Sequence, residues 1–118
     1  MNRIAPVAID LLAVLVFAVV GRASHGRGLS LTGIADTFWP FAIALLVGWL
    51  VVTLLGWEGT KPRETAIIWL VTLAGGMALR TLADDSVQGS FVVVAGAFLA
   101  LFFGGWRLVA WLLRRRRT

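Results

Sequence analysis

The most decisive stretch of the chain reads FVVVAGAFLALFFGGWRLVAWLLRRRR and occupies residues 91–117. Its first part is apolar or small except for Arg107, and a membrane-spanning helix needs about 20 such residues. The four arginines that follow are typical of charge that anchors a helix end at an anionic membrane surface. The stretch therefore predicts a membrane-spanning helix over approximately residues 91–113.

Three further segments have the same character, at approximately residues 4–21, 34–55 and 64–82. The chain of 118 residues is 59% apolar and only 14% charged, with a mean hydropathy of +0.90, whereas a soluble domain is about 45–50% apolar and about 25% charged. No segment alternates as a membrane β-strand does. The sequence thus predicts an all-α, integral membrane four-helix bundle that forms one transmembrane domain over residues 1–118.

The first segment resembles the apolar core of a cleaved signal peptide in its length. However, Asp10 interrupts that core, and the sequence GRASH at residues 21–25 is a poor cleavage site. We therefore expect a retained helix.

The distribution of basic residues predicts the orientation of the bundle. Four spans place both termini on one side, and that side carries seven basic residues, namely Arg3, Lys61, Arg63 and those at 114–117. The other side carries Arg22, Arg27 and Arg80. By the positive-inside rule, both termini are cytoplasmic in a plasma membrane protein. The net charge of +5 does not indicate nucleic-acid binding, because the chain has no soluble reading element.

Local signals predict where the helices begin and end. A glycine at position 21 can close the first helix, and Asp36 or Thr37 can cap the second, with Pro40 in its first turn. Thr60 and Pro62 are typical of a cap and first turn for the third helix. We expect a turn at residues 84–86, followed by Gly89 and Ser90 before the fourth helix.

Asp10 is the most informative residue, because a carboxylate inside a membrane is costly and by default marks a function or a charged partner. It lies about 9 Å from the cytoplasmic end of the first helix, and Arg107 lies about 10 Å from the same side. We predict that the two side chains meet between the first and fourth helices. The pair can be purely structural, or Asp10 can be a functional acid. In a third alternative the two side chains do not pair, and each reaches the interface separately.

A second polar group is expected on the outer side, where basic and hydroxyl side chains could hold a phosphate or carboxylate head group. An ordinary hydrophilic loop is the plainer interpretation, in which the lone histidine is simply solvated. The candidates are Arg22, Ser24, His25, Asp36, Thr37 and Arg80.

Small residues recur at helical spacing and predict close helix packing, either within one chain or between chains. The packing candidates are Ala44 and Gly48, then Thr72 and Gly76, then Gly96, Ala100 and Gly104. A faint repeat also relates Gly48-Trp49 to Gly105-Trp106 at a spacing of 57 residues. A duplicated hairpin would explain it, but apolar helices match easily by chance, so both explanations stay open.

Several of these elements together resemble an uncharacterised family of small membrane proteins, the domain of unknown function numbered three-zero-five-four, common in actinobacteria and also seen in haloarchaea. The resemblance rests on Asp10, GRASH at 21–25, TFWPF at 37–41, Gly48-Trp49 and Arg80, and it covers nearly the whole chain. It implies a four-helix membrane protein, supplies no activity and emphasises Asp10, Arg22, Ser24, His25, Thr37, Pro40 and Arg80. The arginine-rich composition fits an actinobacterial source.

The sequence contains no cysteine and one histidine, and it has no enzyme motif of recognised form. We therefore expect no catalytic activity, no metal and no cofactor. The leading hypothesis is an accessory, lipid-binding or small-ligand-binding bundle that contacts membrane lipid and forms a homodimer or part of a larger membrane complex. The alternative is an oligomeric small transporter or channel that uses Asp10 and polar interior residues.

Overall fold

The described residues of the protein form a bundle of four helices. The computed structural model describes residues 4–24, 31–82 and 89–116, although not the side chains of residues 22–24, 90 and 91. The helices are α1 (Ile4–Ser24), α2 (Leu31–Leu54), α3 (Pro62–Leu82) and α4 (Gly89–Arg116). The described part of the chain contains no strand, and each helix is long and apolar enough to cross a membrane. The predicted all-α membrane fold is confirmed.

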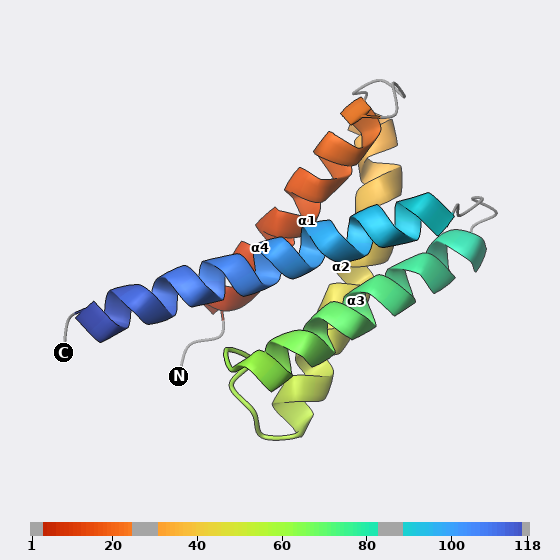
Figure 1. The fold of residues 1–118 in the computed structure, drawn as a ribbon. Coiled ribbons are helices and arrows are strands. Elements are labelled where there is room, and N and C mark those ends of the chain that lie inside the picture. Colours follow the sequence, from red (N-terminus) through yellow and green to blue (C-terminus); the bar gives the residue numbers. More distant parts are fainter. Residues whose placement is uncertain (1–3, 25–30, 83–88, 117–118) are drawn as a thin grey trace.

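The helices pack as a closed ring in chain order. Helix α2 lies against α1 and most extensively against α3, and α4 returns to contact both α3 and α1. Within the described residues, the backbones of the diagonal pairs, α1 with α3 and α2 with α4, do not approach one another closely. The start of α1, the segment between α2 and α3, and the last turn of α4 lie at the same end of the bundle (Figure 1). We call this the basic end, because it carries Lys61, Arg63 and Arg114 to Arg116.

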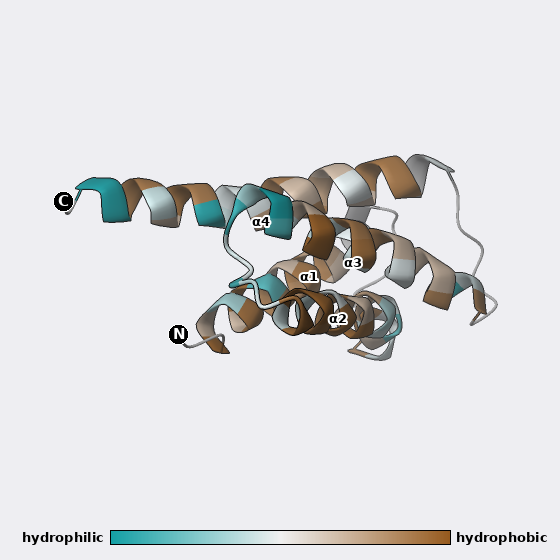
Figure 2. Cartoon of the chain, turned by 90° about the horizontal axis from the view of Figure 1, so that it is seen from below, coloured by the Kyte–Doolittle hydropathy of each residue, from teal (hydrophilic) through white to brown (hydrophobic). Residues whose placement is uncertain are grey.

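The outside of the bundle is apolar along most of its length. Large side chains such as Leu12, Leu46 and Leu101 are exposed, and hydrophobic colour covers much of each helix, whereas hydrophilic colour gathers at the C-terminal end of α4 (Figure 2). A soluble monomer rarely exposes an apolar surface of this extent. Hydrocarbon is therefore the solvent that this surface fits.

Two predicted helix ends are wrong. Helix α1 continues through Gly21 to Ser24, and α2 begins at Leu31 rather than at a cap formed by Asp36 or Thr37. Instead, the Thr37 hydroxyl donates to the carbonyl of Gly33, 3.4 Å away, inside the helix. In hydrocarbon, backbone groups must be satisfied within the segment, which favours extending a helix over ending it.

Pro40 therefore lies inside α2 and not in its first turn. It cannot donate to the carbonyl four residues earlier, a loss that transmembrane helices tolerate. Helix α3 begins at Pro62, two residues before the expected start, with Pro62 in its first turn as predicted. Helix α4 already includes Gly89 and Ser90 and ends three residues later than expected. The turn predicted at residues 84–86 lies outside the described residues.

Small residues bring α2 and α3 together. A Cβ atom added to Gly75 would lie 2.9 Å from the Ala44 Cβ, and one added to Gly48 would lie 3.4 Å from the backbone of Ile68. A Cβ on Gly76 would collide with the Phe41 ring. The predicted close packing through Ala44, Gly48 and Gly76 is thus confirmed within one chain, while the Thr72 hydroxyl bonds its own helix at the Ile68 carbonyl.

Of the three small residues predicted to pack on α4, only Gly96 contacts another helix closely. Gly96 packs against Leu73 of α3, and its carbonyl accepts a 2.8 Å hydrogen bond from the Trp69 indole. Ala100 is exposed, and a Cβ on Gly104 would meet no atom within 4 Å. Those two positions do not bring helices together, because α3 and α4 leave a pocket beside them.

Candidate functional site

The centre of the site is the carboxylate of Asp10, which α1 holds completely buried. Both of its oxygens are paired with the guanidinium of Arg107, at 2.9 Å for Oδ1 with Nη1 and 2.8 Å for Oδ2 with Nη2. This is the bidentate geometry in which a planar guanidinium matches a carboxylate best. The predicted meeting of Asp10 and Arg107 is confirmed.

Two tryptophans complete the surroundings of the carboxylate. The indole Nε1 of Trp49 on α2 donates to Oδ2 at 2.9 Å, and that of Trp106 on α4 donates to Oδ1 at 2.8 Å. Asp10 therefore accepts four hydrogen bonds from three side chains. A buried charge is tolerated where its partner and its hydrogen bonds are both supplied, and this arrangement supplies them.

Arg107 extends the network from Asp10 to the segment between α2 and α3. Its Nε donates to the carbonyl of Gly59 at 3.0 Å, and its Nη1 also donates to the carbonyl of Phe103 at 3.0 Å. The rings of Trp106 and Trp49 lie 4.5 and 5.8 Å from the guanidinium carbon, within the range of cation–π attraction. The guanidinium of Arg107 thus interacts with groups from α1, α2, α4 and the segment between α2 and α3.

Glu64 fixes the same segment from the other side. Its Oε1 accepts from the backbone N–H groups of Gly59, Thr60 and Lys61, at 2.7, 3.2 and 3.4 Å. Glu64 is the third residue of α3, the position from which a glutamate reaches back in a capping box. A chain of contacts therefore runs from Asp10 through Arg107 and Gly59 to Glu64, and we call these four residues with Trp49 and Trp106 the polar network.

Gly59 is required by both conformation and space. Its φ of +89° lies in the left-handed region, which favours glycine. A Cβ at this position would collide with the ring of Trp49, which is itself held by Asp10. The shape of the loop and the orientation of Trp49 therefore depend on one another.

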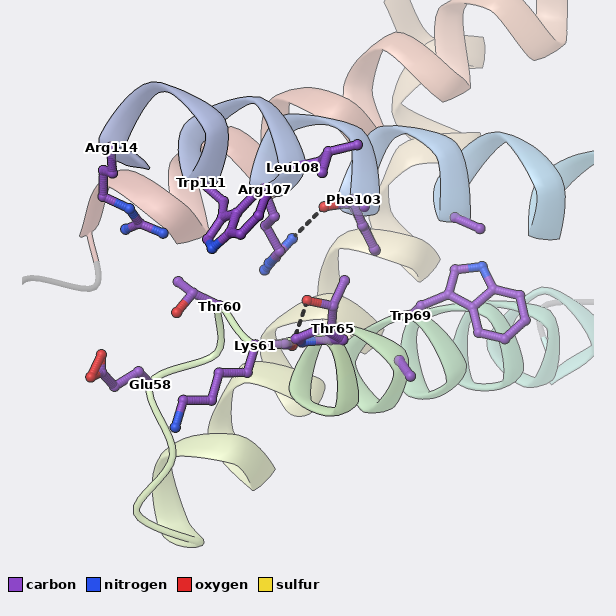
Figure 3. A pocket seen from close by; sticks show the side chains of 14 residues that line it. Glu58, Thr60, Lys61, Thr65, Trp69, Phe103, Arg107, Leu108, Trp111 and Arg114 are labelled. Atoms are coloured by element: carbon purple, nitrogen blue, oxygen red, sulfur yellow. Dashed lines mark hydrogen bonds between the residues drawn. The ribbon is translucent and has the colours of Figure 1, made fainter. Parts of the chain in front are cut away.

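A pocket of about 1010 Å³ opens beside the polar network, between α3 and α4 (Figure 3). Trp69, Phe103 and Leu108 are among its apolar lining residues. Ala100 and Gly104 line its floor, and their small side chains leave space between the two helices. Its outer part carries charged side chains, with Glu58 and Lys61 from the segment before α3 and Arg114 from α4. The pocket is thus mostly apolar, although Thr65 and Arg107 also line it, and it is charged at its mouth.

Comparison with known proteins finds a family model described as protein of unknown function (DUF3054), which matches residues 7–110. The chain belongs to this family. Neither the curated proteins nor the solved structures include a match. The DUF3054 match spans all four helices, so it covers both the polar network and most of the pocket, and it brings no activity with it.

The outer group predicted for this DUF3054 chain is only partly described. Arg80 is buried at the end of α3, Thr37 is buried and bonds its own helix, and Asp36 is exposed with no ion pair to Arg80. The side chains of Arg22 and Ser24, and His25 as a whole, lie outside the described residues. Among the described residues, no hydrogen bond or ion pair joins the side chain of Asp36 or Thr37 to another member of the group.

Four members of the polar network were missed as site residues, namely Trp49, Gly59, Glu64 and Trp106. Signals for them exist in the sequence. The two Gly-Trp pairs share a spacing of 57 residues, and a proline followed two residues later by a glutamate is typical of a helix start in which the glutamate caps. Within the described ranges, no three acidic or histidine side chains gather as a metal site would require.

Proposed function

We propose that the protein is a plasma membrane bundle, with both termini in the cytoplasm, that binds one membrane lipid in the pocket between α3 and α4. Its role is that of a binding or accessory protein and not of an enzyme. The pocket carries the proposal, because it combines apolar walls with a charged mouth. A volume of about 1010 Å³ matches the upper end of the roughly 300–1,000 Å³ usual for ligand sites.

The position of the pocket favours a lipid over a water-soluble ligand. Its walls include Ala66 and Leu108, which are exposed on the surface that we assign to hydrocarbon. A groove open to the bilayer is in contact with acyl chains at very high local concentration. An acyl chain fills the apolar part of such a groove without desolvating a polar group.

The fold explains why α3 and α4 stand apart here. Helix α4 is held at this depth by Trp106 and Arg107, which bind Asp10 of α1, whereas α3 is packed tightly on α2. Ala100 and Gly104 add little side-chain volume between the two helices. The polar network therefore supports one wall of the pocket while leaving its interior open.

The test fills the pocket from its floor. We expect Gly104→Phe to lower the amount of lipid retained by the purified protein, measured by native mass spectrometry from mild detergent. Gly21→Phe is the matched control, because a Cβ at position 21 also meets no atom within 4 Å but the residue does not line the pocket. Equal lipid retention by the two variants contradicts the proposal.

In the transport alternative, Asp10 would bind and release a proton during each transport cycle. Its full burial and its four hydrogen bonds support a structural role instead. We expect no proton-coupled flux in proteoliposomes from the wild-type chain, and loss of an observed flux in Asp10→Asn is the result that favours transport. The expected homodimer or larger membrane complex stays a prediction, which the mass of the solubilised particle tests.

A further inference from the structure

The mouth of the pocket carries an excess of exposed positive charge. Asp10 and Glu64 are buried and occupied by hydrogen bonds, so they contribute little outward negative charge. Among the described residues, Glu58 is the one exposed acid that lines the pocket, whose lining also includes Lys61 and Arg114. Arg63, Arg115 and Arg116 are exposed nearby on the same end, so the local potential favours an anion.

Among the described residues, Arg63 and Arg115 each lie over an aromatic ring, whereas Lys61 and Arg114 do not. Arg63 lies over the ring of Trp57, at 4.4 Å from guanidinium carbon to ring centroid, and Arg115 lies over Trp111 at 5.3 Å. Within the described part of the chain, the ammonium of Lys61 and the guanidinium of Arg114 have no hydrogen bond, ion pair or ring contact. Both residues also line the pocket, Lys61 from the segment directly before α3 and Arg114 from α4 (Figure 3).

The two cations also stand at the right depth for a head group. Lys61 directly precedes α3, and Arg114 begins the basic end of α4, so both belong to the interfacial level. The apolar walls run from there toward Trp69 and Ala100, deeper along the two helices. A phospholipid with its acyl chain among those walls places its phosphate at the mouth.

We propose that Lys61 and Arg114 bind the phosphate of a phospholipid with a net negative head group, which makes the pocket selective for anionic lipid. This inference rests on the proposed lipid site and adds the class of head group. Lysine supplies a point charge and arginine a planar pair of donors, and both bind phosphate in proteins. Glu58 disfavours a second negative charge close by, and so limits the site to a head group of low net charge.

The experiment measures lipid selectivity of the full chain in detergent by native mass spectrometry. The probes are phosphatidylglycerol and phosphatidylcholine with identical acyl chains. The variant K61Q/R114Q is compared with R63Q/R116Q, which removes the same charge from the same end but from residues that do not line the pocket. Glycerol 3-phosphate is the third probe, because it carries the phosphate without an acyl chain.

We expect the wild-type chain and R63Q/R116Q to prefer phosphatidylglycerol. K61Q/R114Q should reduce that preference roughly thirtyfold, since it removes two cations and each cation near a membrane surface contributes about 1 kcal/mol. E58Q should increase the preference. An equal loss in the two double variants, or no preference in the wild type, overturns the inference. Binding of glycerol 3-phosphate as tight as that of the lipid overturns it in favour of a free phosphate site.

The outcome also separates this inference from the proposed function. If Gly104→Phe lowers binding of both lipids while K61Q/R114Q changes neither, the pocket binds lipid without selecting the head group. If Gly104→Phe has no effect on either lipid, the lipid site itself is wrong. Circular dichroism of each variant confirms that the helices are intact before binding is compared.

Discussion

Trp49 and Trp106 donate their indole N–H groups to the two different oxygens of one carboxylate, that of Asp10. The two residues are separated by 57 positions and each follows a glycine. They approach Asp10 from α2 and α4, the two helices that lie on either side of α1 in the ring. A single buried acid thereby orients three helices, and the duplication that this spacing suggests stays a prediction.

Replacing either indole by a benzene ring should destabilise the protein. Trp49→Phe and Trp106→Phe each remove one hydrogen bond to a charged acceptor, which costs about 1.5–3 kcal/mol. Trp39→Phe is the control, because that indole is exposed and should change stability by less than about 0.5 kcal/mol. The measurement is the free energy of unfolding in mixed micelles, and a loss in the control equal to that in the two variants would contradict a specific role for the indole donors.

The Asp10–Arg107 pair should show strong coupling. Asp10→Ala and Arg107→Ala each leave a buried charge without its partner, which costs about 3–5 kcal/mol, whereas the double variant removes both charges. The loss in the double variant should therefore be well below the sum of the single losses. Strictly additive losses in the same unfolding assay would show that the bridge contributes no pairwise stability.

Substituting two glycines of the segment between α2 and α3 should distinguish the cost of backbone strain from that of a steric collision. Gly56 and Gly59 both have positive φ, but a Cβ at position 56 meets open space, whereas one at position 59 collides with Trp49. We expect Gly56→Ala to cost about 1 kcal/mol from strain alone, and Gly59→Ala to cost at least about 2 kcal/mol more. Unfolding of both variants checks this, and equal losses would mean that the Trp49 ring moves aside freely.

The α2–α3 contact should be far more sensitive to added volume than the pocket floor. Gly76→Ala forces a methyl group into the Phe41 ring and should cost about 1–3 kcal/mol. Gly104→Ala adds the same methyl group where no atom lies within 4 Å, and helix propensity alone should make it neutral or slightly stabilising. Thermal unfolding in detergent compares them, and the reverse order of stability would refute the packing described for α2 and α3.

Part of the site could be predicted because the depth of a residue in the membrane follows from its distance along the helix. Counting residues from the helix ends placed Asp10 and Arg107 at the same level, and a buried carboxylate needs a cation. The outer group could not be treated in this way. Thr37 was expected at a helix start, but the helix extends past it, and its hydroxyl bonds the backbone of its own helix instead.

What the sequence by itself determined is the solvent, the number of helices and the meeting of Asp10 with Arg107, because hydropathy and helical rise depend only on the order of residues. Only the tertiary structure decided which face of each helix points inward. That rotation brings Trp49, Trp106 and the Gly59 carbonyl to the polar network, and it opens the pocket beside Ala100 and Gly104. The physical reason is that packing of α3 on α2, and of α4 on α1, fixes the distance between α3 and α4, and no local pattern records that distance.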